Sequence, residues 1–202
     1  MKLKFKLPLA FGGILLLMLL AGLGGIYALN RALDQFNVEV NAALERERTA
    51  REIDSQFKTQ VQEWKNTLLR GRDDKQRDRY WKAFGENERE VGRQAQGLLK
   101  ALPEGAARDL TAQFLREHQA MAARYADGFK AFQAAQFDAA AGDKAVQGVD
   151  REASRLVRAL AERISEDAQQ MQLMATESGR RATWISLALM ADFVLASPRA
   201  RF

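Results

Sequence analysis

The chain has 202 residues, a single histidine, no cysteine and a formal net charge of +5. The lack of cysteine excludes thiol chemistry, and one histidine is too few to assemble a nucleophile, a base and an orienting group, so we do not expect an enzyme. The positive charge is concentrated at the two ends, because residues 31–181 hold 26 basic and 25 acidic side chains, a net of +1. This balance removes the main argument for nucleic-acid binding.

The N-terminal segment has the composition of a membrane anchor. Residues 7–30 form a run of 24 uncharged residues, and Lys2, Lys4 and Lys6 precede it. A helix needs about 20 apolar residues to cross a bilayer. We therefore expect a cytoplasmic segment at 1–6 and a transmembrane helix at 7–30 in a bacterial inner membrane, with the main domain, 31–181, on the periplasmic side. A cleaved signal peptide is the alternative, although its apolar core would be shorter, about 7–15 residues, and no A-x-A site follows.

The rest of the chain has helical periodicity and no strand signals. Apolar residues recur at steps of three or four, which predicts helices over 30–69, 74–102, 105–136 and 144–181. Gly71 is expected to end the first helix and Asp73 or Asp74 to cap the second. Pro103 is expected to stop the second helix, and residues 137–144 are interpreted as a turn. The predicted fold class is therefore all-α.

The lengths of these helices suggest how they are arranged. The first and fourth helices are longer than the middle pair, which predicts an up-down-up-down four-helix bundle whose outer helices continue from the same end toward the membrane. The stretch RGRDD, residues 70–74, would then lie at the tip farthest from the bilayer. Seven basic and three acidic residues fall between Lys65 and Lys82, so this tip is expected to be basic.

The C-terminal segment is apolar again but less regular. Residues 182–198 follow Arg180 and Arg181 and contain one acid, Asp192. A charge near the centre of a membrane helix costs about 2.5–3.5 kcal/mol on insertion scales. We interpret this segment as an incomplete second transmembrane helix, and residues 199–202 as a tail.

Two blocks of sequence resemble the extracytoplasmic sensory region of bacterial methyl-accepting chemotaxis proteins. They are FKTQVQEWKNTLLRGRDDKQRDRYWKAF, residues 57–84, and DKAVQGVDREASRLV, residues 143–157. The resemblance implies a homodimer of four-helix bundles with a ligand pocket in the distal half. It also implies a second membrane crossing, a HAMP linker and a cytoplasmic coiled coil that engages a kinase.

Neither a HAMP linker nor a signalling hairpin is found in this sequence. The expected role is therefore a membrane-anchored sensory module for chemotaxis that lacks its own output domain. The alternative is a truncated receptor fragment that acts only as a structural or interfering partner of full-length chemoreceptors.

The candidate ligand site lies at the predicted tip. Lys65 and Arg70 would present basic groups to an anionic small molecule, since arginine pairs with carboxylates through two hydrogen bonds. Arg72 and Arg79 are weaker candidates, and a solvated basic surface is the simpler explanation for all four. Trp64 is close enough to line a pocket, as is Trp81. Core packing is favoured for both, because aromatic residues at helical spacing usually fill a bundle.

Other polar residues have structural explanations. His118 faces the apolar stripe of the third helix. A haem held between it and Met121 is a minor alternative, and covalent attachment of haem is excluded without cysteine. We predict no metal site and no cofactor. Glu86, Glu88 and Glu90 alternate around their helix, which indicates a solvated surface. In the anchor, Ala21 and Gly25 form a small-xxx-small pair that favours helix pairing.

Overall fold

The computed structural model describes residues 3–196, and it leaves out some side chains before residue 36 and after residue 174. By their internal contacts, residues 1–42 and 43–202 form two units, which are described separately. The described residues form five helices and no strand. They are α1 (Leu3–Arg70), α2 (Asp74–Ala101), α3 (Ala106–Ala134), α4 (Ala139–Ala145) and α5 (Arg151–Ala196). The all-α prediction is confirmed.

The first unit is the N-terminal part of α1. Most of its described large apolar side chains are exposed, whereas Phe36 and Val40 are half-buried. The exposed ones are Leu16, Leu19, Leu20, Leu23, Ile26, Tyr27, Leu29, Leu33 and Val38. Among the residues that the structure describes, no helix is long and apolar enough to cross a membrane. Many side chains of the predicted crossing at 7–30 and nearly all of those at 182–198 are not described, and the tail at 199–202 lies outside the described residues. Both crossings stay predictions.

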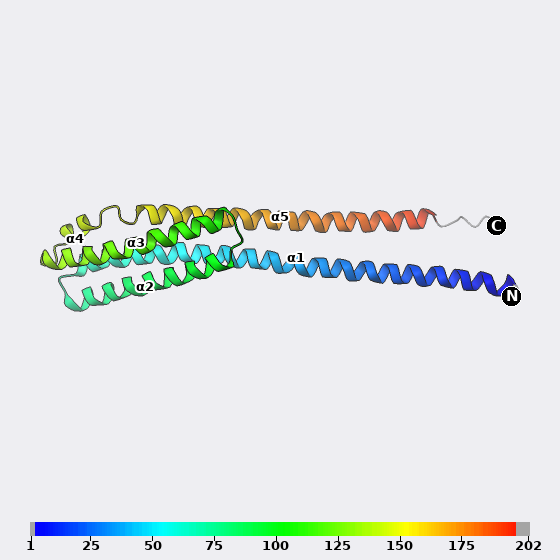
Figure 1. Ribbon diagram of the computed structural model, residues 1–202, viewed down its shortest axis with the longest axis horizontal. Coiled ribbons are helices and arrows are strands. Elements are labelled where there is room, and N and C mark those ends of the chain that lie inside the picture. Colours follow the sequence, from blue (N-terminus) through cyan, green and yellow to red (C-terminus); the bar gives the residue numbers. More distant parts are fainter. Residues whose placement is uncertain (1–2, 197–202) are drawn as a thin grey trace. The chain divides into compact units, whose positions relative to one another are not determined.

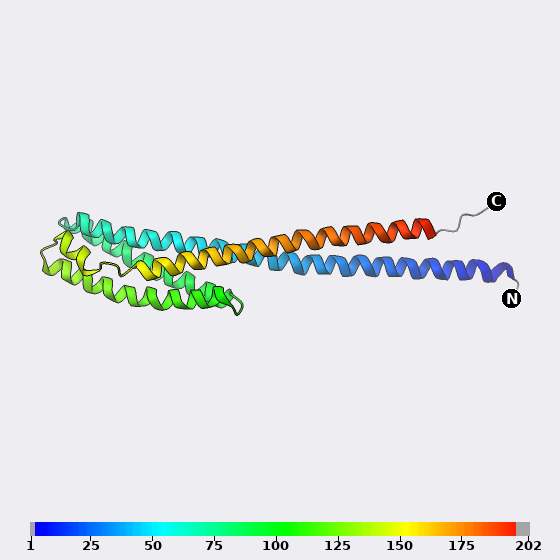
Figure 2. The same ribbon diagram turned by 90° about the horizontal axis from the view of Figure 1, so that it is seen from above.

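The second unit contains the end of α1, all of α2, α3 and α4, and α5. Its long helices lie side by side in both views, with the α1–α2 turn and α4 at one end and the α2–α3 turn at the other (Figures 1 and 2). At the latter end, Ala43 of α1 and Met171 of α5 line one cavity. Helices α1 and α5 therefore both reach this end of the unit.

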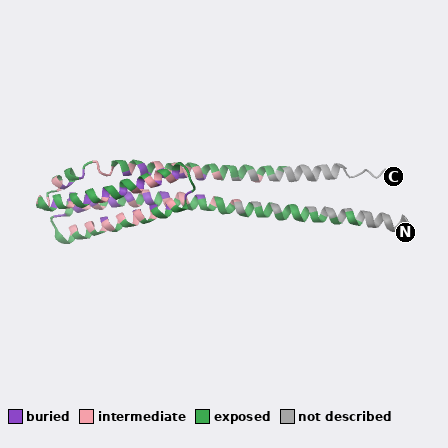
Figure 3. Ribbon diagram, in the orientation of Figure 1, coloured by how far each residue is buried: buried purple, intermediate pink, exposed green. Residues whose placement is uncertain are grey.

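The core follows from a repeating spacing of three and four residues. The buried residues of α3 are Ala107, Thr111, Phe114, His118, Met121, Tyr125, Gly128 and Phe132, which alternate in steps of four and three. Such a repeat keeps one stripe facing neighbouring helices along the whole element. Figure 3 shows the buried positions of the long helices turned toward one another.

The first turn is closed by capping and by close packing. Asp73 caps α2, since its Oδ1 accepts a hydrogen bond from the backbone N–H of Gln76 at 3.0 Å, as predicted. Gly71 follows the last residue of α1, but its φ is not positive. A Cβ at this position would overlap the ring of Phe132. Glycine is thus required here for space, and not for the left-handed conformation that usually ends a helix.

The predicted turn at 137–144 and the predicted start of the last long helix at residue 144 are both wrong. Asp138 caps the short helix α4 by accepting from the N–H of Ala141 at 3.2 Å. Helix α4 ends at Ala145, and the turn that follows contains Gly148, whose φ is +77°. Val146 is nevertheless buried, in the space beside Gly128 of α3. A Cβ at residue 128 would overlap Val146, so the glycine leaves room for its side chain. The apolar side chain of Val146 therefore packs on α3, and Val146 is not part of α5.

Candidate functional site

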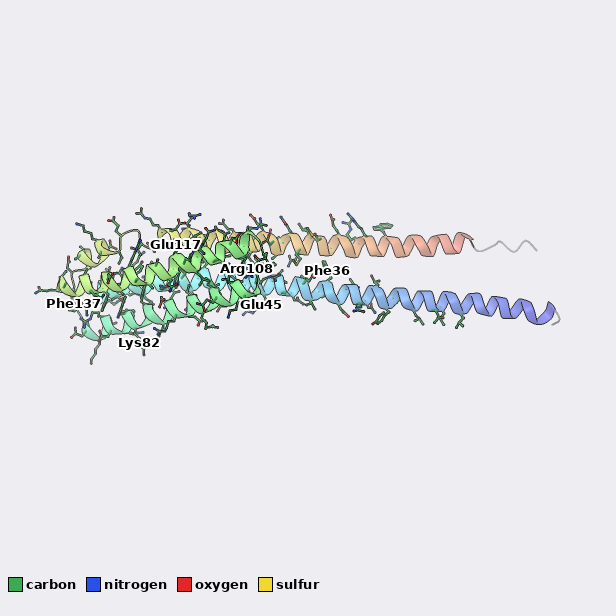
Figure 4. All side chains as sticks on the ribbon, in the orientation of Figure 1. Phe36, Glu45, Lys82, Arg108, Glu117 and Phe137 are labelled. Carbon is green, nitrogen blue, oxygen red and sulfur yellow. The ribbon has the colours of Figure 1, made fainter. Side chains whose placement is uncertain are left out.

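The predicted basic tip brings two arginines to one tyrosine. The Arg70 guanidinium, in the last turn of α1, lies 5.0 Å from the centre of the Tyr80 ring, and that of Arg79 lies 5.6 Å from it. Arg70 also donates from Nη1 to Oδ1 of Asn66 at 2.7 Å. We call Arg70, Arg79 and Tyr80 the Tyr80 basic cluster. Figure 4 labels Lys82 on α2 and Phe137 toward this end of the unit.

The other two predicted cations, Lys65 and Arg72, are exposed near the α1–α2 turn. Lys65 lies on α1 and Arg72 in the turn, and neither forms an ion pair with any residue that the structure describes. Arg70 and Arg79 also form no ion pair with a described residue; both guanidinium groups lie over the tyrosine ring, and Arg70 donates to Asn66. Cations without acidic partners are available to an anionic ligand, although exposed charges of this kind are also common on any solvated surface.

Arg77 is the one basic residue of the tip that is held inside it, and the sequence did not single it out. Its side chain is only 12% exposed and its Nη1 lies 2.7 Å from Oδ1 of Asp74. The same nitrogen donates to the carbonyl oxygen of Gly71 at 3.3 Å, and the guanidinium lies 4.2 Å from the centre of the Phe137 ring. The spacing of Asp74 and Arg77 by three residues could have indicated the ion pair, but not the contact with Phe137.

Trp64 lies in the core and not in the Tyr80 basic cluster. It is 2% exposed, and its ring lies 5.2 Å from that of Tyr125 and 5.9 Å from that of Trp81. Trp81 in turn stacks on Phe129 with ring centres 4.2 Å apart. The Nε1 of Trp64 has no acceptor among the described residues. The geometry agrees with the core-packing interpretation of both tryptophans.

His118 is buried in a hydrogen-bonded pair. Its Nε2 lies 2.8 Å from Oε1 of Gln60 on α1, and the rings of Phe57 and Phe114 lie 5.9 and 5.4 Å away. Burial lowers the pKa of His118 to about 4, so the imidazole is neutral at pH 7 and its Nε2–H donates to Gln60. Gln60 is fully buried and its Nε2 has no acceptor among the described residues. The pair is thus a polar layer in an apolar core.

Metal binding finds no support in the part of the chain that the structure describes. No group of three or more histidine, cysteine, aspartate or glutamate side chains there is arranged to hold a metal ion. Glu90 is instead paired with Arg93, which holds the pKa of Glu90 below its usual value, and Lys82 lies 3.7 Å from Glu86.

Comparison with known proteins gives one informative match. The chain is 33% identical over 149 residues to the methyl-accepting chemotaxis protein CtpH of Pseudomonas aeruginosa. The aligned part covers 74% of this chain but 26% of that protein, so the chain spans about a quarter of its relative. The chain matches no family model and no solved structure. The resemblance to chemotaxis proteins inferred from residues 57–84 and 143–157 is confirmed.

Proposed function

Because most of this chain is a chemoreceptor-related region, we propose that it forms the sensory, ligand-binding module of a membrane-anchored chemotaxis receptor. The observation that carries the proposal is the arrangement of the second unit. Ala43 on α1 and Met171 on α5 line one cavity at the α2–α3 end, whereas the Tyr80 basic cluster belongs to the other end. A signal received at the basic tip would reach the far end through α1 and α5.

We interpret the packed helices as an up-down-up-down four-helix bundle on the periplasmic side of a bacterial inner membrane. The exposed apolar side chains between Leu16 and Leu33 support an anchor in that part of α1, because large exposed apolar surfaces mark contacts with membranes or other proteins. A shift of α5 relative to α1 by a small distance is the kind of two-state change that helix packing permits.

We further propose that the module is a homodimer. The small residues Ala21 and Gly25 are one helical turn apart in the predicted anchor, and such pairs let two membrane helices approach closely. Since the chain has no cysteine, the variants Ala21→Cys and Gly25→Cys can form a disulfide only between chains. In membranes, we expect one of these variants to give a covalent dimer on oxidation. Monomer at both positions would contradict pairing through this face.

The proposed ligand is an anionic small molecule bound at the Tyr80 basic cluster. Arg70 and Arg79 lie over the same ring and have no acidic partners, so a carboxylate could accept hydrogen bonds from both. The test is a thermal-shift screen of the full chain against anionic metabolites. A ligand at 100 times its Kd should add about 2.7 kcal/mol to the free energy of unfolding.

The double variant Arg70→Gln, Arg79→Gln is the corresponding binding test. We expect it to lose the stabilisation by any ligand found in the screen, whereas Arg116→Gln, an exposed position on α3, should keep it. The function itself is tested by replacing the sensory region of a full-length chemoreceptor with residues 1–181 and measuring swarming toward that ligand. A chimera that is inserted in the membrane but blind to every stabilising ligand would refute the sensory role.

A further inference from the structure

The end of the second unit opposite the Tyr80 basic cluster contains a cavity of about 320 Å³. It is bounded by Ala43 and Arg46 of α1, by the α2–α3 turn, and by the stretch of α5 from Arg163 to Met174. Figure 4 labels Arg108 at the start of α3 and Glu45 on α1 in this region. Three separate parts of the chain therefore meet around one hollow, at the end where α1 and α5 continue past the middle helices.

Small residues leave this space empty. Ala43, Ala106, Ala107 and Ala168 all line the cavity and are joined there by Gly105, whose φ of +143° is rarely adopted by residues with side chains. The remaining wall is largely apolar, with Leu102, Ile164 and Met171. A hollow of this size with apolar walls falls at the lower end of the range of about 300–1,000 Å³ that is typical of small-molecule pockets.

The charged groups of the lining are unevenly paired. Asp167 lies 2.8 Å from Nη2 of Arg163, and Glu104 lies 3.4 Å from Nε of Arg108, so both carboxylates already have a cationic partner. Arg46 forms no ion pair with any described residue and makes only a 3.4 Å hydrogen bond to the carbonyl oxygen of Ala101. Arg46 is therefore the charged group of the described lining that lacks an ionic partner.

Arg163 is held by carboxylates of its own helix. Its Nη2 lies 2.8 Å from Oδ1 of Asp167 and its Nη1 lies 4.0 Å from Oε2 of Glu166. Its Nε is buried and closed to the cavity. A ligand in the cavity would therefore meet Arg46 as its cation, and not Arg163.

We propose that this cavity binds a small organic carboxylate with an apolar body. The carboxylate would accept hydrogen bonds from the guanidinium of Arg46, and the body would lie against Leu102, Ile164 and Met171. The site is separate from the Tyr80 basic cluster and takes a different ligand, with apolar contacts supplying much of the affinity. A regulatory role for this site rests on the proposed sensory function. A ligand bound there would contact α1, the α2–α3 turn and α5 together.

The probe for this site is 3-phenylpropionate, compared with 3-phenylpropylamine and 3-phenyl-1-propanol. The three share the same apolar body and differ in the charge of the head group. Isothermal titration of the full chain in nanodiscs, corrected with empty nanodiscs, should show saturable binding of the carboxylate. The amine and the alcohol should bind at least about tenfold more weakly, as expected for the loss of a charge-assisted hydrogen bond. No saturable binding of the carboxylate, or equal binding of all three, would overturn the proposal.

Two variants locate the binding. Ala106→Trp fills the cavity from an exposed position at the start of α3 and should abolish binding, whereas Ala134→Trp, at the exposed end of the same helix, should leave it unchanged. Arg46→Gln removes the cation but leaves the apolar wall intact, and should raise the Kd about tenfold. Helix content and melting temperature are measured for each variant, and Arg46→Gln also locates the binding if Ala106→Trp does not fold.

Binding that survives both Ala106→Trp and Arg46→Gln would place the ligand elsewhere and refute this site. The test is independent of the proposed function, because a chain that ignores 3-phenylpropionate can still respond to an anion at the Tyr80 basic cluster. Conversely, loss of response in the chimera leaves binding at this cavity measurable.

Discussion

The two ends of the helical unit solve the same problem, closing a bundle of helices, in different ways. At the α1–α2 turn, Phe132 occupies the space left by Gly71, and Arg77 lies over the ring of Phe137. At the α2–α3 turn, alanines and Gly105 surround a cavity of about 320 Å³. The first end is filled by aromatic rings and carries its cations outside except for Arg77, whereas the second contains a cavity with Arg46 in its lining. Closure by rings leaves surface sites only, and closure by small residues leaves room for a ligand.

The largest loss of stability is expected from a substitution in the core next to the α1–α2 end. Trp64→Ala removes a ring that is 2% exposed and contacts the rings of Tyr125 and Trp81. We expect a loss of about 3–5 kcal/mol in the free energy of unfolding, measured by urea denaturation. Leu69→Ala, at a 77% exposed position five residues further along α1, should cost less than about 0.5 kcal/mol. A small loss for Trp64→Ala would mean that this end is not tightly packed.

Between the two ends, the Gln60–His118 pair should make stability depend on pH. The pKa of His118 is lowered from 6.5 to about 4 in the folded chain, so the unfolded chain binds the extra proton first as the pH falls. Stability is therefore full above about pH 6.5 and falls as the pH decreases from there toward 4, by up to about 2–3 kcal/mol. Since this is the only histidine, His118→Gln should remove the dependence between pH 6.5 and 5.

Three carboxylates titrate below this window, because the pKa values of Glu47, Glu90 and Glu152 are lowered from 4.5 by hydrogen bonds from neighbouring arginines. They therefore do not mimic the histidine between pH 6.5 and 5. An unfolding free energy that stays constant over this range in the unmodified chain would show that His118 is accessible to protons, and that the polar layer is open.

The third effect tests the filled end directly. Gly71→Ala introduces a Cβ that would overlap the ring of Phe132, and we expect a destabilisation of about 1–3 kcal/mol from overpacking. Gly92→Ala is the matched control, because a Cβ there meets nothing within 4 Å. Within helix α2 that change should stabilise by about 0.5–1 kcal/mol. If both variants are stabilised in thermal melts, Phe132 can move aside and the end is not rigid.

The sequence predicted the elements that depend on local chemistry. Helical periodicity, the Asp73 cap and the stop near Pro103 all depend on neighbouring residues, so they could be inferred without a structure. The errors arise where distant contacts decide. Val146 has the spacing of a stripe residue but packs beside Gly128 after a short helix, and Gly71 is needed because Phe132, sixty-one positions later, is in the way.

For the candidate sites too, the sequence shows the local features but not the contacts between distant residues. A cluster of cations near Gly71 is visible in the sequence, but the sequence does not show that Arg70 and Arg79 share the ring of Tyr80 while Arg77 turns inward. The cavity at the other end gave no signal, because its lining comes from alanines on three elements that are far apart in the chain. A hollow is defined by residues that are too small, and no short motif reports their convergence.

The smallest effect is expected at the hollow end and completes the comparison. Ala106→Leu adds three carbon atoms at an exposed position that lines the cavity. Space is available there, so we expect a change within about 0.5 kcal/mol in the free energy of unfolding, in contrast to the single carbon added by Gly71→Ala. The same variant should weaken binding of 3-phenylpropionate, because it occupies part of the cavity. If Ala106→Leu destabilised the chain as much as Gly71→Ala does, the α2–α3 end would be filled in solution, and the difference between the two ends would not exist.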